Sequence, residues 1–369
     1  MYRLEDLDFM REALRLAAEG TALASPNPRV GAVVVREGQI VGQGTHRYEQ
    51  KTHAEVLALE QAGEAARGAS LYVNLEPCCH TGRTGPCVEA IVAAGIARVV
   101  VGMRDPNPAV NGGGLERLAA AGVKVESGCL GREARQLNEA FAKWIRTGLP
   151  WVNLKAALSL DGRIGGAQAS SVGARRWISS QLSRERVQTL RHASDAVLTG
   201  IGTVLNDDPL LTDRSKLERR RPLLRVVLDS GLRLPPAARI LKGARRQLDL
   251  LVFHSRGAEA ERQELETAGA RIAAVAADAS GRVDLEAVLR RLGAEQITSV
   301  LLEAGPHVNG AMLTGGWVDK LILFQAPLLL GGGSIPLAAL AAEPQRQIEG
   351  ALTCERVGPD LMIEAYLAS

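Results

Sequence analysis

The pattern His53-Ala54-Glu55, Pro77-Cys78 and Cys87 places three strong metal-binding side chains on separate stretches of the chain. A metal site requires the fold of this half to bring the three together. One imidazole and two thiolates suit zinc, and three protein ligands leave a fourth position for water, whose pKa bound zinc lowers towards neutrality. His53, Cys78 and Cys87 are therefore expected to form an open, catalytic zinc site.

Glu55 follows His53 by two residues and is suited to move protons between a water and a leaving amine. Residues two apart on a helix point about 200° apart, so the two side chains converge only where a helix begins. A helix start also directs free N–H groups into the site. The alternatives are a structural zinc site, closed by Cys79 or His80, and cysteines that bind no metal. Cys79 is expected instead to pack or to face the pocket.

Cysteine usage and charge restrict the compartment and the partners. The five cysteines are too few and too clustered for a disulfide framework, which favours metal or thiol chemistry in a reducing compartment. Acidic residues at positions 5, 6 and 8 oppose a signal peptide, and the longest apolar runs are about half a membrane span. A net charge of +3 with 3% aromatic residues gives no support for nucleic-acid or membrane-surface binding. We expect a cytoplasmic protein.

A length of 369 residues favours two domains, and Gly148-Leu149-Pro150 is the expected boundary, because proline cannot continue a helix. The predicted domains are 1–147 and 148–369. In the first, strands alternate with helices after an initial hairpin, which predicts an α/β/α layered sheet. Helices are expected over 6–19, 53–66, 87–94, 114–121 and 131–147, and strands over 30–35, 39–43, 70–75, 97–102 and near 123.

The second half alternates again and predicts another α/β domain. Its strand 297–303 ends at Glu303-Ala304-Gly305-Pro306, directly before a predicted helix over 307–314. A glycine turn at a helix start can cradle phosphates with free N–H groups, although many such turns bind nothing. The other strands are expected over 151–157, 195–200, 223–229, 248–253, 317–325 and 361–367, and the other helices over 179–192, 258–268 and 283–292.

The stretches SPNPRVGAVVV (25–35), HAEVLAL (53–59) and LEPCCHTGRTGPC (75–87) resemble the deaminase half of the bifunctional deaminase–reductases of riboflavin biosynthesis. The eight residues between Cys78 and Cys87 are normal in that family. The resemblance implies a cytidine-deaminase-like fold, zinc on His53, Cys78 and Cys87, and Glu55 as proton donor. It also implies substrate contacts from Asn27, to the pyrimidine, and from His46 and Arg83, near the ribose phosphate.

The stretches NLKAALSLDG (153–162), WIS (177–179), LTGIGTVLNDDPLLTDR (198–214), VVLDS (226–230) and LLEAGPHVNGAML (301–313) resemble the reductase half of the same family, whose fold is like dihydrofolate reductase. Arg175 departs from it, since the family has serine there and lacks the extension at 167–174. The resemblance implies substrate contacts from Arg191, Leu211, Arg214 and Glu303. Arg175 either meets the substrate phosphate as well or is merely exposed. It implies NADPH contacts from Ala157, Trp177, Thr203, Asp207, Ser230, Gly305, Pro306, His307, Val308, Asn309, Gly310 and Ala311.

This resemblance predicts two successive reactions on small pyrimidine ribose-phosphates. The first is the zinc-dependent hydrolytic deamination of 2,5-diamino-6-ribosylamino-4(3H)-pyrimidinone 5′-phosphate, and the second is the NADPH-dependent reduction of the ribosyl group to a ribityl side chain. The alternative is a nucleoside or tRNA zinc deaminase with an unrelated second nucleotide-binding domain, which leaves the second-half motifs unexplained. A non-catalytic zinc module conflicts with the presence of Glu55. The family also implies a homo-oligomer, with no nucleic-acid or membrane partner.

Overall fold

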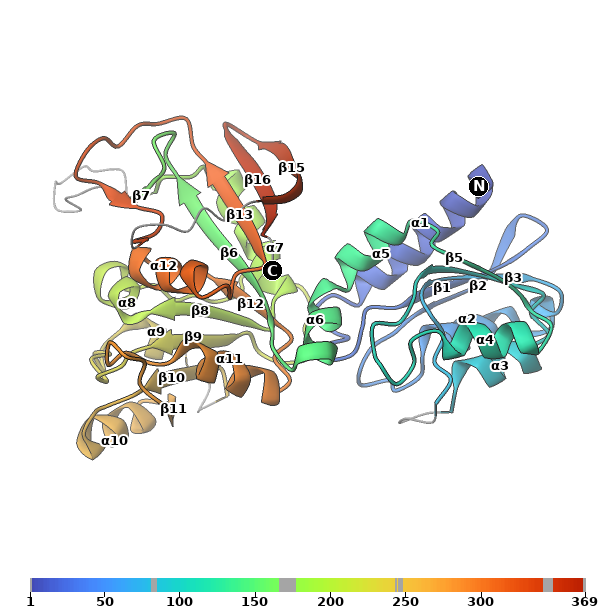
Figure 1. Ribbon diagram of the computed structural model, residues 1–369, viewed down its shortest axis with the longest axis horizontal. Coiled ribbons are helices and arrows are strands. Elements are labelled where there is room, and N and C mark those ends of the chain that lie inside the picture. The colour runs from blue at the N-terminus through green and yellow to red at the C-terminus, as the bar shows by residue number, and fades with distance from the viewer. Residues whose placement is uncertain are drawn as a thin grey trace. The chain divides into compact units, whose positions relative to one another are not determined.

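A computed structural model describes residues 2–80, 85–165, 177–242, 244, 248–340 and 348–367, with the backbone alone at 348–351. The chain divides into two compact units (Figure 1). The first contains Met1–Gly148 together with the short segment Glu218–Arg221, and the second contains Leu149–Leu217 and Pro222–Ser369. In the described parts of the chain, no helix is both long and apolar enough to cross a membrane.

The first unit is built on a five-stranded sheet of order β2-β1-β3-β4-β5. β1 pairs antiparallel with β2 and β3, while β3, β4 and β5 run parallel. The initial hairpin and the parallel pairing that follows it are those expected from the sequence. The strands are β1 (Gly31–Arg36), β2 (Gln39–Thr45), β3 (Ser70–Leu75), β4 (Arg98–Met103) and β5 (Lys124–Ser127).

Helices cover both faces of this sheet (Figure 1). Along β1, Val33 and Val35 pack with residues of α1, and Ala32 and Val34 pack with residues of α2, α3 and α4. Gly31 permits the close approach of α1, because a Cβ there would lie 2.1 Å from the carbonyl oxygen of Ala13. The helices are α1 (Leu4–Glu19), α2 (Ala54–Ala62), α3 (Cys87–Ala93), α4 (Gly113–Ala120), α5 (Gly131–Leu137) and α6 (Glu139–Thr147), with a 3₁₀ turn over Gly63–Ala66.

The helix expected over 131–147 is two helices, which Asn138 separates. Asn138 has φ −113° and ψ 17°, outside helical geometry. Its side-chain amide accepts from the backbone N–H of Arg29 at 2.8 Å and donates to the carbonyl of Arg29 at 3.0 Å. Asparagine readily exchanges helical hydrogen bonds for such side-chain bonds, which explains the break. The same bonds hold the chain just after Asn27.

The second unit is built on a nine-stranded sheet of order β11-β10-β9-β8-β12-β6-β13-β16-β15. The strands from β11 to β13 run parallel, and β16 and β15 complete the sheet antiparallel. The strands are β6 (Trp151–Leu158), β8 (Ala196–Gly200), β9 (Leu224–Leu228), β10 (Leu250–His254), β11 (Arg271–Ala274), β12 (Ser299–Leu302), β13 (Lys320–Gln325), β15 (Ile348–Val357) and β16 (Asp360–Leu367); β7 (Arg163–Gly165) pairs separately with β14 (Ile335–Pro336).

Apolar clusters lie on both faces of the larger sheet. Val152 and Leu154 of β6 pack with α11 and α12, whereas Val197 of β8 packs with α9 and α10. α7 covers Ile322 and Phe324 of β13. The helices are α7 (Gln181–Ala193), α8 (Ile201–Asp207), α9 (Arg239–Lys242), α10 (Glu259–Thr267), α11 (Leu285–Ala294) and α12 (Pro306–Thr314).

Candidate functional sites

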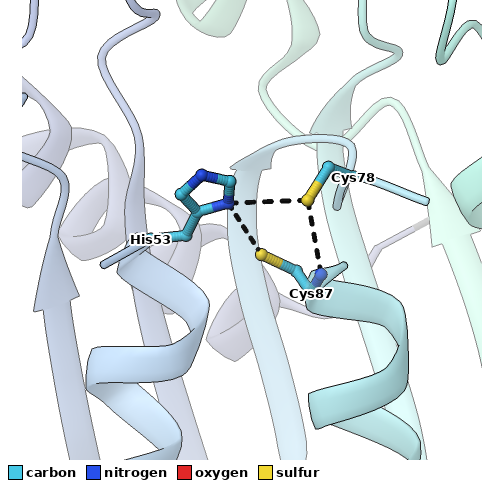
Figure 2. Close-up of side chains that lie close together, drawn as sticks. All are labelled: His53, Cys78 and Cys87. Carbon is cyan, nitrogen blue, oxygen red and sulfur yellow. Dashed lines mark hydrogen bonds between the residues drawn. The ribbon is translucent and has the colours of Figure 1, made fainter. Parts of the chain in front are cut away.

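Three different elements bring the predicted metal ligands together in the first unit. His53 is the residue before α2, Cys78 follows β3, and Cys87 is the first residue of α3. The Nδ1 atom of His53 lies 3.0 Å from the Sγ atom of Cys87 and 3.5 Å from that of Cys78 (Figure 2). The backbone N–H of Cys87 donates to the Sγ atom of Cys78 at 3.3 Å. The predicted ligand set is therefore assembled in space.

The donor set fits a zinc ion with an open coordination position. The three ligand atoms all lie within 4.8 Å of one another. Zinc–ligand bonds of about 2.0–2.3 Å at tetrahedral angles require donor atoms about 3.5 Å apart. Among the described residues, no fourth histidine, cysteine or acidic ligand joins the cluster. Cys79 is buried and packs in the core, with its Sγ atom 3.1 Å from where a Cβ of Gly113 would stand. This arrangement opposes the closed, structural zinc site.

The two thiols differ in acidity, because they share hydrogen bonds. The Cys87 thiol donates to Cys78, and this hydrogen bond, helped by the one with His53, lowers the pKa of Cys78 to about 4, although burial acts in the opposite direction. The pKa of Cys87 is raised by the same hydrogen bond and by burial. The hydrogen bond to Cys78 also raises the pKa of His53. Because thiolates and neutral imidazole are the forms that bind zinc, metal binding must release protons here.

Glu55 lies beside the ligand cluster without belonging to it. It is the second residue of α2, immediately after the extended His53 (φ −79°, ψ 156°), as expected for convergence at a helix start. Its side chain is buried, with the residue only 4% exposed, and burial raises the pKa of its carboxyl group. A carboxyl group in such a position can hold a proton and pass it on.

Asn27 and His46 contact each other next to the cluster. The side-chain nitrogen of Asn27 lies 3.0 Å from Nε2 of His46, and Nδ1 of His46 lies 3.1 Å from the carbonyl oxygen of Thr52. Since a carbonyl only accepts, Nδ1 carries the proton and Nε2 accepts from the Asn27 amide. The His46 ring stands edge-on to His53, with centroids 5.4 Å apart. Arg83, the third predicted substrate residue of this half, lies outside the described residues.

Glu76 is a buried carboxylate of this site that the sequence reasoning missed. Its oxygens accept the backbone N–H groups of Asp105, Gly112, Gly114 and Leu115 at 3.1, 3.0, 2.9 and 3.3 Å. These bonds attach the first turn of α4 and the segment before it to the residue just before Pro77-Cys78. The only sequence signal was its place in the run Leu75-Glu76-Pro77-Cys78, where an acidic residue directly follows a buried strand.

In the second unit, Glu303 and Arg191 form a buried ion pair. The Nε and Nη2 atoms of Arg191, on α7, donate to the two carboxylate oxygens of Glu303 at 2.6 and 3.1 Å. Lys155 of β6 lies 3.5 Å from the same carboxylate. Burial raises the pKa of Glu303, but the charges of Arg191 and Lys155 outweigh burial and bring it to about 2. Glu303 is therefore ionised at neutral pH. Lys155 was not singled out from the sequence.

The predicted phosphate cradle is the start of α12. Gly305 precedes the helix and Pro306 is its first residue. Proline is favourable there, because the first N–H groups of a helix have no partner within the helix and the missing N–H of proline costs no hydrogen bond. Thr203 of α8 lies beside it, with its Oγ1 atom 3.8 Å from where a Cβ of Gly305 would stand. The Asn309 side chain is turned inward, donating to the carbonyls of Ala304 at 3.0 Å and Leu337 at 2.9 Å. His307 and Ala311 are exposed, and Val308 packs against Gly200.

The remaining predicted residues lie on neighbouring elements of the second unit. Trp177 is 55% exposed, and it lines a hollow of about 360 Å³ with Ser179, Arg184, Pro327 and Asp360. Ala157 is half-buried on β6, Asp207 ends α8, and Ser230 follows β9 and accepts the N–H of Val283 at 3.1 Å. Leu211 is buried in the core, Arg214 is exposed, and Arg175 lies outside the described residues.

Comparison with known proteins assigns each half of the chain to a described domain family. Residues 4–103 match the cytidine and deoxycytidylate deaminase zinc-binding region, and residues 150–357 match the RibD C-terminal domain. The riboflavin biosynthesis protein RibD of Escherichia coli is 42% identical, over 98% of this chain and 99% of the relative. RibD of Aquifex aeolicus is 39% identical, over 98% of this chain and 99% of the relative.

Solved structures agree with this assignment of the two halves. The structure of Acinetobacter baumannii RibD, form 1, superposes with a TM-score of 0.84 at 38% identity, covering 99% of each chain. The diaminohydroxyphosphoribosylaminopyrimidine deaminase/5-amino-6-(5-phosphoribosylamino)uracil reductase of Thermotoga maritima superposes with a TM-score of 0.82 at 33% identity, again covering 99% of each chain. The predicted fold class, a cytidine-deaminase-like domain followed by an α/β reductase domain, is confirmed. The chain therefore belongs to the RibD family, the bifunctional zinc deaminases and NADPH-dependent reductases of riboflavin biosynthesis.

Proposed function

We propose that residues 1–147 deaminate 2,5-diamino-6-ribosylamino-4(3H)-pyrimidinone 5′-phosphate, and that residues 148–369 then reduce its ribosyl group to a ribityl chain. The observation that carries the proposal is the open cluster of His53, Cys78 and Cys87 with the buried Glu55 beside it. The Thermotoga maritima relative carries both activities in its name. The deaminated product of the first half is, chemically, the substrate of the second.

In the first half, His53, Cys78 and Cys87 hold the zinc. When bound, the ion supplies an acidified water for attack on the ring carbon that bears the amino group. Glu55 takes the proton of that water and delivers it to the departing amine. Its burial supports this role, because a raised pKa lets the carboxyl group hold the proton between the two steps. Asn27, fixed by His46, presents its amide oxygen to the pyrimidine.

In the second half, NADPH supplies the hydride that reduces the opened ribosylamine. The N–H groups at the start of α12 receive the phosphates of the cofactor, with Thr203 beside Gly305. Glu303, held ionised by Arg191 and Lys155, accepts hydrogen bonds from substrate hydroxyl or amino groups. Arg214, Leu211 and the remaining residues named from the resemblance complete the two binding surfaces.

The proposal is tested by mixing zinc-loaded protein with the diaminopyrimidinone phosphate and NADPH. Ammonia release and NADPH oxidation are recorded in the same sample. Both signals are expected, with ammonia appearing first. Ammonia without NADPH oxidation contradicts the reductase assignment. If metal-replete, folded protein yields neither signal, the substrate assignment fails, and nucleosides become the next substrates to test.

The expected assembly of the protein rests on the same family resemblance. We propose a homo-oligomer that acts on small molecules, without a nucleic-acid or membrane partner. Light scattering on the purified chain tests the first point, and a subunit mass equal to the particle mass contradicts it. A cytoplasmic location stays a prediction from the cysteine pattern.

A further inference from the structure

One face of α7 holds the segment that follows α8. Arg191 donates from Nη1 to the carbonyl oxygen of Thr212 at 3.1 Å. The Nδ1 atom of His192 lies 3.1 Å from a carboxylate oxygen of Asp213, and both side chains are buried, at 7% and 8% exposure. Three successive residues, 212 to 214, are thereby tied to one helix, because the backbone N–H of residue 214 also donates to Gln188 at 2.9 Å.

The held segment has a backbone that does not form easily. Leu211 has φ +52°, Asp208 has φ +41° and Lys216 has φ +64°, and all three are left-handed conformations that side-chain-bearing residues rarely adopt. Such conformations persist only where surrounding contacts over-determine them. Asp213 also fixes the turn that follows, because its other carboxylate oxygen accepts the N–H of Ser215 at 2.9 Å.

Asp213 continues a line of alternating charges that begins at the substrate residues. Lys155 contacts Glu303, Glu303 pairs with Arg191, and Asp213 favours the charged form of Arg191 while it pairs with His192. Such a buried network is rigid only when each member has its partner. Removing Asp213 therefore affects both the backbone of the segment and the guanidinium that holds Glu303.

We propose that His192 and Asp213 are positioning residues of the reductase site, which fix residues 211–214 so that the Arg214 side chain and the backbone of Leu211 meet the ribose phosphate of the substrate. The inference rests on the function proposed above. It adds two residues that touch neither substrate nor cofactor, and that act through the backbone of their neighbours.

The test uses the full-length, zinc-loaded protein and the variants Asp213→Ala, His192→Ala and His192→Asn. Asparagine retains a donor for Asp213 near the position of Nδ1. Asp195→Ala is the matched control. Asp195 is a buried aspartate of the same unit, and its carboxylate accepts two hydrogen bonds from Thr298. It lies just before β8, at the end of that strand opposite to α8. Four quantities are measured: KM and kcat for the aminouracil substrate, the inhibition constant of inorganic phosphate against reduction, the Kd of NADPH, and ammonia release.

Asp213→Ala is expected to raise KM and the phosphate inhibition constant by about tenfold, the factor that corresponds to one lost buried hydrogen bond to a charged group. His192→Ala acts in the same direction, and His192→Asn restores most of the loss. The kcat value, the Kd of NADPH and ammonia release stay within about twofold. The weakened contacts with the substrate phosphate act equally in the ground state and in the transition state, so their loss raises KM and leaves kcat unchanged. The control lowers thermal stability without changing KM.

Unchanged KM and phosphate inhibition in Asp213→Ala overturn the positioning role. Equal losses in the control variant overturn it as well, because they show a general loss of stability. If His192→Asn is as impaired as His192→Ala, the hydrogen bond between the two residues is not what matters and the pair assignment fails. Absence of NADPH oxidation by the unmodified protein overturns the proposed function itself, and this inference with it.

Discussion

His53 and Cys87 stand 34 positions apart in the chain, yet the Nδ1 and Sγ atoms of the two residues lie 3.0 Å apart. A residue that precedes one helix and the residue that begins another supply these atoms, so both are fixed by helix starts rather than by flexible loops. Ligands on such rigid supports need little reorganisation to receive a metal.

Glu55→Gln should lower ammonia release by about 10²–10⁴-fold, the range that a general acid–base contributes. The zinc content should stay at one ion per chain, and reduction of the deaminated intermediate should be unaffected. Ammonia assay, metal analysis and NADPH absorbance measure the three effects. Glu60→Gln, an exposed position on the same helix, is the control and should behave as the unmodified protein. Deamination at the normal rate in Glu55→Gln removes Glu55 from the mechanism.

Cys78→Ser and Cys79→Ser compare two neighbouring thiols that differ in role. Cys78→Ser should lose zinc and ammonia release, because a hydroxyl group is a much weaker zinc ligand than a thiolate. Cys79→Ser should retain both, since Cys79 packs in the core. Metal analysis of the purified variants measures the difference. Zinc loss in Cys79→Ser would show that Cys79 is a ligand.

Glu303→Gln should lower the free energy of unfolding of the second unit by about 3–5 kcal/mol, because it removes the carboxylate that pairs with the buried Arg191 and Lys155. Urea unfolding measures this loss, and NADPH oxidation should fall while ammonia release persists. Glu355→Gln breaks an exposed pair with Arg186 and should cost less than about 1 kcal/mol. Equal stability losses in the two variants would contradict the account.

Gly310→Ala should disturb the cofactor cradle. A Cβ there would lie 2.2 Å from the carbonyl oxygen of Ala339, so the segment packed on α12 has to move. We expect a stability loss of about 1–3 kcal/mol and a raised Kd for NADPH, measured by fluorescence titration. Gly202→Ala meets no atom within 4 Å and lies in α8, so it should be neutral or stabilising. Unchanged NADPH binding in Gly310→Ala would show that the packing of Ala339 against α12 does not affect cofactor binding.

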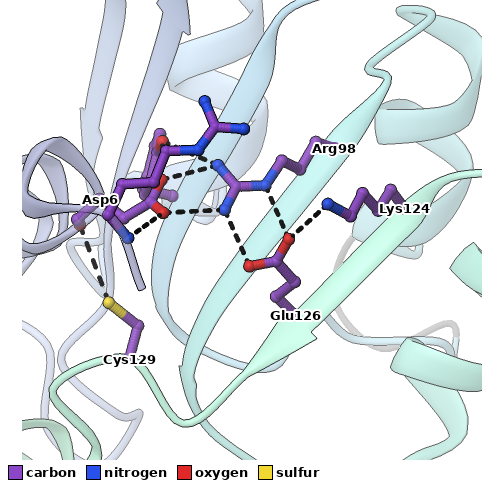
Figure 3. A network of polar contacts seen from close by, with 7 residues as sticks. Asp6, Arg98, Lys124, Glu126 and Cys129 are labelled. Atoms are coloured by element: carbon purple, nitrogen blue, oxygen red, sulfur yellow. Dashed lines mark hydrogen bonds and ion pairs between the residues drawn. The ribbon is translucent and has the colours of Figure 1, made fainter. Parts of the chain in front are cut away.

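The first unit should lose stability in acid through the network around Arg98 (Figure 3). Arg98 donates to Asp6 at 2.7 Å and to Glu126 at 2.8 Å. These bonds hold the pKa of Asp6 well below its usual range and lower that of Glu126 to about 2. In the unfolded chain both groups titrate near pH 4. Their contribution is therefore complete above about pH 5 and disappears as pH falls through their folded-state pKa values.

Scanning calorimetry of the full chain between pH 7 and pH 3 measures this effect. Asp6→Asn should melt at a lower temperature at pH 7 and lose less on acidification than the unmodified protein. Asp8→Asn changes an exposed residue of the same helix and should follow the unmodified curve. Parallel curves for Asp6→Asn and the unmodified protein would show that the pair does not couple to pH.

Much of the fold was predictable, because strand and helix periodicity is strong in buried elements. The strand expected over 70–75 is β3, and the helix expected over 87–94 is α3 within one residue. β11 and β15 were not predicted. Both lie at edges of the nine-stranded sheet, where a strand is paired on one side only and its sequence need not be apolar. The break at Asn138 depends on a partner, Arg29, that is far away in sequence.

The candidate sites were predictable to the extent that residue chemistry alone identifies them. Histidine, cysteine and glutamate in a metal-type spacing predicted the cluster of His53, Cys78, Cys87 and Glu55. Glu76, Lys155 and the pair of His192 and Asp213 were missed, since their importance comes from distant partners that only the folded chain supplies. The roles of the individual substrate and cofactor residues stay predictions.

Both ends of the stretch between Cys78 and Cys87 are anchored by the backbone. The N–H of Cys87 donates to the Cys78 thiol, and the N–H of Val88 donates to the Cys78 carbonyl at 3.3 Å. The separation of the two sulfur atoms is thus independent of how many residues connect them. We therefore expect changes in the length of this stretch to leave the metal ligands in place. A lineage of such enzymes is free to remodel this loop for new substrates, while the hydrolytic centre is inherited intact.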